Sequence, residues 1–522
     1  LSRFLFVLAP LLLAPSARAD DCAPAPSPMH PPAAQVLSGT ASHYQPLVAF
    51  DLAPECMRMD LHFGGALRGD LTAPIAIDSS GSTLPASRSL SPRFRLGARF
   101  DSGRAWLPII LHGEYEHDLP TGTLQTDRGF EGQGYPGANG LDHELRKAFV
   151  RVSLGHYAHL SAGWTTSHWG LGLVANDGAH GWQPGSGRIS DPRSGDRVLR
   201  AQLATGPHTN AGLFAAVNAD LLDGDWLADD DVLLPGDRAM QVSFATIAGR
   251  GKLHGGGLYG VIRHQETPSG AATDVFAGDL YLHTGVVLGT LKLTLEAETV
   301  VVTGTTELAP SNDFPEHDVL QFGAALRGSI DAGKVATVFD VLYASGDQNL
   351  DDNAQNAFKA DPNYDMGLLL FRQVIANQTA RGVFTAGDPD LVGVPANDLD
   401  RIATRGSASN TFAFFPRLRV RPLAGLELYM GPLFALAAQP PIDPFNTRIT
   451  GGSARNALGG IPSRYLGTEL DAGVRYRVII GGTEITAGLE GGTLRPGSAF
   501  QRLNGTRMDN VHGARFMLDA KL

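Results

Sequence analysis

The chain has 522 residues, a formal net charge of −11 and a hydrophobic content of 43 %. The negative charge argues against a nucleic-acid partner, because phosphate backbones are bound by an excess of Lys and Arg. The hydrophobic content is that of a soluble protein and argues against a bundle of membrane-spanning helices. It leaves a β-barrel open, since a barrel strand carries apolar residues only at alternate positions.

The N-terminus is typical of a secretory signal, with Arg3, the apolar run Phe4–Leu13 and a small-residue cleavage site at Ala17–Ala19. We expect residues 1–19 to be removed. A short membrane anchor is the alternative, but about ten apolar residues are too few to span a bilayer. Residues 20–55 are rich in Pro and Ala and are expected to form a periplasmic arm.

The sequence has two cysteines, Cys22 and Cys56. In an oxidising periplasm they are expected to form a disulfide. The closed loop of about 35 residues would contribute ~3–4 kcal/mol in the chain-entropy model. Two unpaired thiols are the alternative.

From residue 56 onward, pairs of alternating strands joined by short turns are separated by longer polar loops. In the hairpin 464–494, apolar and polar residues alternate on both sides of a Gly481-Gly482 turn. Short turns on one side and long loops on the other are typical of an outer-membrane barrel. The fold class is therefore all-β, a transmembrane antiparallel up-and-down β-barrel over 56–522. The strands expected are 56–68, 91–101, 105–117, 142–155, 157–168, 196–206, 209–220, 238–249, 251–264, 274–288, 290–303, 317–331, 333–346, 407–421, 424–437, 464–478, 481–494 and 508–522.

An even count of about eighteen strands places both chain ends on the periplasmic side. The largest extracellular loop is expected at 347–406. Within it, Tyr364–Ala376 has a strand-like composition, but one more strand would make the count odd. We interpret this stretch as part of the long loop, with the lumen as one place into which it could fold.

Cationic side chains fix which face of each strand is wet. Arg417, Arg419 and Arg421 alternate along one strand, and a lipid-facing Arg costs about 2–4 kcal/mol at the bilayer midplane. These side chains must therefore face the lumen. The candidate solute pathway comprises Arg58, Arg93, Arg95, Arg99, Lys147, Arg151, Arg327, Arg417, Arg419, Arg421, Arg475, Arg477, Glu469 and Asp471.

Strand direction places several of these arginines toward the periplasmic end, as a basic entrance that attracts anions. The alternative is a generic lumen in which arginines pair with carboxylates such as Glu298 and Glu490. The long loops are acidic, at Asp220–Asp231 and Asp347–Asp365. Ca²⁺ binding there is one interpretation, but the ligand spacing favours a solvated surface and no metal site.

The stretch YLGTELDAGVRYRV, with TEITAGLEGGTLRPGSAF after it, resembles the end of the alginate-export family of outer-membrane porins. Glu144–Arg151 and Gly163-Trp164 resemble an early strand of that family and the segment after it. The resemblance implies an arginine-rich pore of eighteen strands, and it makes Arg95, Arg151, Arg419 and Arg475 candidate lumen contacts. It also leaves room for periplasmic export partners.

These observations predict a channel in the bacterial outer membrane, not an enzyme, with no cofactor. Its partners would be outer-membrane lipids and a polar or anionic small molecule or an exopolysaccharide, which diffuses passively under electrostatic guidance. One alternative is a hydrolase on the barrel rim, built from Ser167, His168, Asp177 and His180. Another is a structural or adhesive barrel that acts through its loops.

Overall fold

The computed structural model describes residues 48–52, 57–102, 109–118, 121–122, 142–155, 157–176, 197–223, 236–249, 253–308, 314–347, 352–364, 366–380, 403–404 and 406–521. The signal segment 1–19, Cys22 and Cys56 lie outside these residues, so the disulfide stays a prediction. β1 (Val48–Leu52) lies within the stretch expected as an arm and pairs with the first barrel strand.

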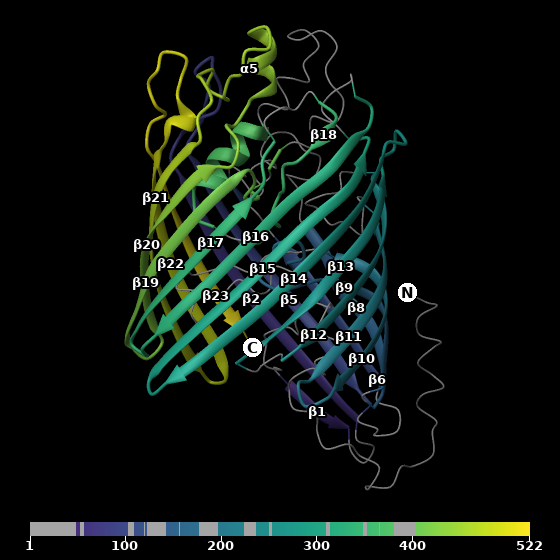
Figure 1. Ribbon diagram of the computed structural model, residues 1–522. Helices are drawn as coiled ribbons and strands as arrows, with labels where there is room; N and C mark the ends of the chain where they lie inside the picture. The colour runs from purple at the N-terminus through teal and green to yellow at the C-terminus, as the bar shows by residue number, and fades with distance from the viewer. Residues whose placement is uncertain are drawn as a thin grey trace.

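A ring of long antiparallel strands dominates the described chain (Figure 1). Each strand pairs with its neighbour in sequence, and the last pairs with the first, Leu518 opposite Leu67. Setting aside β1 and two other short strands, the 21-stranded sheet supplies eighteen strands to the ring. They are β2 (Met57–Thr72), β5 (Ser87–Asp101), β6 (Ile109–Asp118), β8 (Asp142–Leu154), β9 (Ala158–Thr166), β10 (Arg197–His208), β11 (Leu213–Asp223), β12 (Arg238–Ala248), β13 (Gly255–Glu266), β14 (Ala272–Leu288), β15 (Leu291–Thr306), β16 (His317–Asp331), β17 (Val335–Ala344), β19 (Thr411–Leu423), β20 (Leu426–Ala437), β21 (Tyr465–Ile480), β22 (Thr483–Pro496) and β23 (Val511–Lys521). The predicted fold class and strand count are confirmed.

The remaining elements are short and lie in the connections. β7 (Thr121–Gly122) and β18 (Ala354–Gln355) add to the main sheet, and β3 (Ile75–Ala76) pairs with β4 (Thr83–Leu84). The helical elements are the π-helix η3 (Leu370–Ile375), α5 (Pro444–Ile449) and the 3-10 turn η5 (Ser498–Phe500). α5 begins where Asp443 accepts a hydrogen bond from the Asn446 backbone N–H, with Pro444 as its first residue.

The two ends of the ring differ as predicted. Short turns lie at the lower end in Figure 1, and α5 and β18 lie at the upper end. The β21–β22 turn has Gly481 and Gly482 at φ of 59° and 89°, the left-handed backbone that a two-residue hairpin needs. The lower end is therefore the periplasmic end, and the upper end is extracellular.

The two faces of the wall follow the strand alternation. On β20 the outward residues Leu428, Met430 and Phe434 are exposed, whereas Tyr429 and Leu433 between them are buried. Similar exposed Leu, Ile, Val and Phe side chains recur on the other strands. This outer belt suits hydrocarbon, which accepts only closed backbone hydrogen bonding and apolar side chains.

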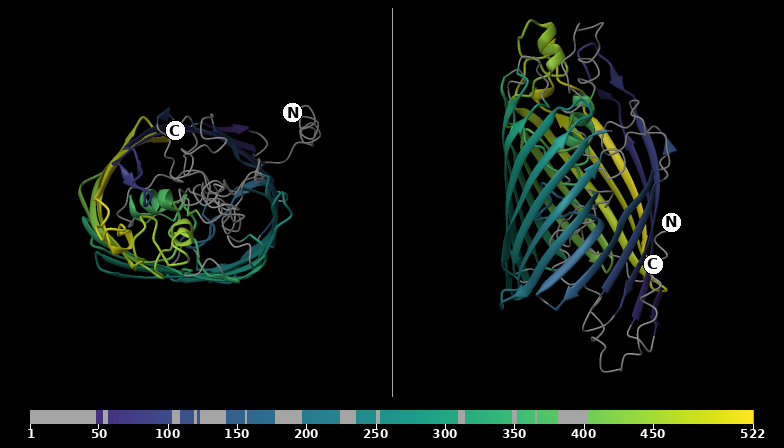
Figure 2. Two further views of the ribbon diagram at one scale, coloured as in Figure 1. Left: turned by 90° about the horizontal axis from the view of Figure 1, so that it is seen from above. Right: turned by 90° about the vertical axis from the view of Figure 1, so that its right-hand side faces the viewer.

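An apolar core fills part of the barrel interior. Leu368, Leu370, Phe371 and Val374, from the loop between β17 and β19, are nearly inaccessible and pack against wall residues such as Phe415. The view along the axis shows this green helical segment inside the ring (Figure 2). The stretch predicted as part of a long loop is therefore folded into the lumen as a helix, not a strand.

Candidate functional site in the lumen

Six arginines on β16, β19 and β21 form a continuous set on the inner wall, which we call the arginine track: Arg327, Arg417, Arg419, Arg421, Arg475 and Arg477. Arg327 and Arg417 share Asp340, Arg419 and Arg421 share Asp331, and Glu427 contacts Arg419, Arg421 and Arg475. Arg477 lies 3.4 Å from Glu484. These four carboxylates link the arginines of the track along the wall toward the periplasmic end.

Burial divides the track into two kinds of residue. Arg417 and Arg419 are 2 % and 0 % exposed, and the Arg417 guanidinium also lies 4.6 Å from the Phe415 ring centre. Such buried and paired groups stabilise the barrel wall, because removal of either partner would leave the other charge buried and unpaired. The side chains of Arg421 and Arg477 are 34 % and 41 % exposed. These two are the most exposed residues of the track, ahead of Arg327 at 18 %.

A second group of cations lies on β5 and β8. Arg95, Lys147 and Arg151 are buried on the inner face, and Arg93 and Arg99 are partly buried. Arg99 lies 3.2 Å from Asp101, and the Arg151 guanidinium lies 5.1 Å from the Phe149 ring centre. The side chain of Arg58 lies outside the described residues. The predicted role of this group as solute contacts stays a prediction.

Glu469 on β21 anchors the helical segment inside the lumen. Its carboxylate accepts hydrogen bonds from the backbone N–H groups of Leu368, Leu369 and Leu370 at 2.5, 2.9 and 2.8 Å. Gly367, at φ +77°, lets the chain approach, since a Cβ there would lie 3.0 Å from the Glu469 carboxylate. A carboxylate at the start of a helix satisfies donors that lack partners within the helix.

Glu298 on β15 anchors a second inward segment in the same way. It accepts hydrogen bonds from the backbone N–H groups of Leu171, Gly172 and Leu173, in the loop that follows β9. Gly170, at φ +54°, again precedes the three donors. Trp169 supports the segment by donating from its indole N–H to Asp279 at 3.0 Å. Two unrelated loops are thus held across the lumen by one wall carboxylate each.

These contacts correct part of the predicted pathway. Glu469 and Asp471 have no exposed surface, so neither lines an open passage in this arrangement, and Glu469 holds a loop instead. Glu298, which the alternative of a generic charged lumen paired with arginines, binds loop backbone. Asp220, expected in an acidic loop, lies on β11 and pairs with Arg200 at 2.7 Å. Sequence alternation identified the inner face correctly but not the partner, which is a loop distant in sequence.

An apolar run within a polar loop was the signal for these anchors. Residues 367–371 read Gly-Leu-Leu-Leu-Phe between polar stretches, and residues 170–174 read Gly-Leu-Gly-Leu-Val. Apolar side chains in an extracellular loop need a place away from water, and the barrel interior provides it.

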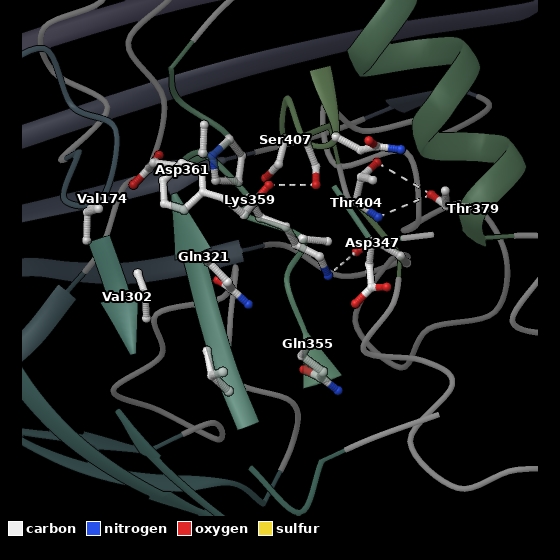
Figure 3. Close-up of a pocket in the computed structure, with 18 of the residues that line it drawn as sticks. Val174, Val302, Gln321, Asp347, Gln355, Lys359, Asp361, Thr379, Thr404 and Ser407 are labelled. Carbon is white, nitrogen blue, oxygen red and sulfur yellow. Dashed lines mark hydrogen bonds between the residues drawn. The ribbon is translucent and has the colours of Figure 1, made fainter. Parts of the chain in front are cut away.

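A cavity of about 560 Å³ lies above the anchored segments, toward the extracellular end. Its strand side includes Val302 and Gln321, and its loop side includes Lys359, Thr404 and Ser407 (Figure 3). The lumen is thus narrowed by two inward segments, with a vestibule above them and the arginine track on the wall below.

The described residues of the Ser167–His180 cluster do not support the alternative of a hydrolase on the barrel rim. The Ser167 hydroxyl accepts a hydrogen bond from Arg200 at 2.7 Å, which is not the base that a nucleophile needs. Asp177 and His180 lie outside the described residues. Within the ranges that the structure covers, no group of three His, Cys, Asp or Glu side chains is placed to hold a metal ion. No described helix has the length and apolarity needed to cross a membrane.

Comparisons with known proteins identify the architecture. No family model and no curated protein matches the sequence. Among solved structures, Pseudomonas aeruginosa OccK2 (OpdF) is 11 % identical, with a TM-score of 0.50 over 89 % of this chain and 97 % of that one. Acinetobacter baumannii OccAB1 is 10 % identical, with a TM-score of 0.50 over 88 % and 96 %. The outer membrane protein OprD of P. aeruginosa is 10 % identical, with a TM-score of 0.47 over 93 % and 97 %.

The chain is an outer-membrane β-barrel. The closed strand ring and the apolar outer belt define this architecture, and the solved structures share its fold. At these identities the likeness establishes the fold, not the solute. The comparisons give no support to the alginate-export resemblance in particular.

Proposed function

We propose that this barrel is a passive channel for small polar or anionic solutes. The observation that carries the proposal is the arginine track on the inner wall, in which the guanidinium groups of Arg421 and Arg477 are accessible to a solute. An excess of positive charge in a confined, low-dielectric passage raises the local concentration of anions. Weak contacts at successive sites let a solute enter and leave without a chemical step.

The size of the solute follows from the inward segments. Both are anchored by three hydrogen bonds to a buried carboxylate, and both pack in the same apolar core. An exopolysaccharide, with periplasmic partners to deliver it, would require both segments to leave the lumen. A small solute requires only the space beside the two segments. We therefore propose a small solute in preference to an exopolysaccharide.

Ion selectivity in planar bilayers tests the proposal. The double variant Arg421→Gln with Arg477→Gln removes the two accessible charges and spares the buried Arg417 and Arg419. We expect the wild type to prefer anions. The anion preference of the variant, measured from the reversal potential in a salt gradient, should be severalfold weaker.

Arg502→Gln is the matched control. Arg502 pairs with Asp509 at 3.0 Å, and both lie in the exposed loop between η5 and β23, outside the lumen. The control should keep wild-type selectivity. A wild type that prefers cations would contradict the track's role, and a folded barrel with no conductance would favour the adhesive alternative.

A further inference from the structure

The vestibule above the anchored segments differs chemically from the arginine track. Its described lining carries three carboxylates, Asp347, Asp361 and Asp443, against two cations, Lys359 and Arg263. Each carboxylate accepts a hydrogen bond from loop backbone, Asp347 from Asn356 and Asp361 from Asn176 and Asn363, and Asp443 caps α5. The net charge of this lining is therefore negative, opposite to that of the track.

Neutral hydrogen-bonding groups provide the rest of the polar lining. Gln321 on β16 points into the cavity (Figure 3), and its amide contacts no hydrogen-bond partner in the described chain. The Gln355 amide, which also lines the cavity, donates to the Leu308 carbonyl at 2.8 Å. Thr404 and Thr379 form a hydroxyl pair at 3.4 Å on the loop side. These groups both donate and accept hydrogen bonds.

Apolar side chains lie beside these polar groups. Val302 on β15 is the cross-strand neighbour of Gln321, and Val174, on the segment held by Glu298, lies on the same side of the cavity as Val302 in Figure 3. A cavity of about 560 Å³ is within the usual range of about 300–1,000 Å³ for small-molecule sites. The occupant must therefore be small, and it must combine apolar C–H groups with groups that donate and accept hydrogen bonds.

We propose that this vestibule binds an uncharged polyhydroxylated solute of about monosaccharide size, which arrives from the extracellular side. Hydroxyl groups both donate and accept, so they match the Gln321 and Gln355 amides and the threonine hydroxyls. The C–H face of such a ring packs on Val174 and Val302. An anion is disfavoured here because the lining carboxylates outnumber the cations. The inference rests on the proposed channel and names the solute class of its outer site.

Current blockade by added solutes tests the inference. D-glucose and its acid counterpart gluconate are added in turn to the extracellular side of single channels in a planar bilayer. We expect glucose to interrupt the ion current in a saturable, concentration-dependent way, with gluconate at least severalfold weaker. Gln321→Leu should weaken the glucose blockade about tenfold, because it removes the donor and the acceptor of the amide at nearly constant volume.

Two further measurements keep the outcomes separate. Unblocked conductance and anion preference in the same bilayer report whether Gln321→Leu is folded and whether the proposed channel exists at all. Thr493→Val, which removes a hydroxyl bonded to His512 between β22 and β23 and away from the lining, should block like the wild type. Stronger blockade by gluconate than by glucose would overturn the proposal, as would equal blockade of Gln321→Leu and wild type, or no blockade by either solute in a conducting channel.

Discussion

Gly367 offers the sharpest test of whether the anchored helical segment sets the width of the lumen. Gly367→Ala places a Cβ at φ +77°, 2.6 Å from Leu433 Cδ2 and 3.0 Å from Glu469 Oε1. The left-handed backbone costs roughly 1–2 kcal/mol for a residue with a Cβ. Overpacking against the wall adds roughly 1–3 kcal/mol. Both terms oppose the docked arrangement, in which Glu469 receives its three N–H donors.

The contact with the wall is separable from the backbone strain. Gly451, in the extracellular loop after α5, has φ +69°, and a Cβ added there would meet nothing within 4 Å. Gly451→Ala therefore carries the same strain without the overlap. Since each 1.4 kcal/mol is tenfold in an equilibrium constant, the overlap alone shifts Gly367→Ala toward the undocked state by about 5- to 150-fold.

Single-channel recording with polymers of graded size measures that shift. We expect Gly367→Ala to show larger and more frequent high-conductance openings and to admit larger polymers, whereas Gly451→Ala matches the wild type. Gly170→Ala, whose Cβ would lie 2.5 Å from Glu298 Oε2, should act similarly on the other segment. Wild-type conductance and size limit in a folded Gly367→Ala channel would refute the view that this segment constricts the lumen.

Three further results are expected from other parts of the barrel. Met430→Lys puts a charge on the lipid-facing side of β20, where Met430 is 51 % exposed, and should lower the free energy of unfolding from lipid vesicles by about 2–4 kcal/mol, while Met430→Leu should change it little. Asp443→Ala removes the N-cap of α5, worth about 1 kcal/mol, and should speed limited proteolysis within 444–449; protection equal to wild type would count against the cap. Anion selectivity should fall when salt is raised from about 0.1 M to about 1 M, because screening weakens the exposed charges of Arg421 and Arg477; a selectivity independent of salt would point to the buried arginines instead.

The strand ring was predictable from the sequence because its cause is local. Side chains alternate across a strand, so a run such as residues 426–437 shows which residues face lipid wherever the strand lies in the ring. Charge then fixes which face is wet, since an outward Arg417 or Arg419 would cost more than the strand gains. Predicted and observed strand bounds differ by a few residues at most ends, and the eighteen strands agree.

The loop segments inside the barrel are held by contacts that the alternation of apolar and polar residues along a strand does not predict. Leu368 and Glu469 are 101 residues apart in sequence, and Leu173 and Glu298 are 125 apart. Periodicity places Glu469 on the wet face whether its partner is an arginine, a solute or a loop. The sequence by itself determined a barrel with a charged interior. Only the tertiary structure determined that two carboxylates hold loops across it, because that choice depends on which distant N–H groups the folded loops bring within hydrogen-bonding distance.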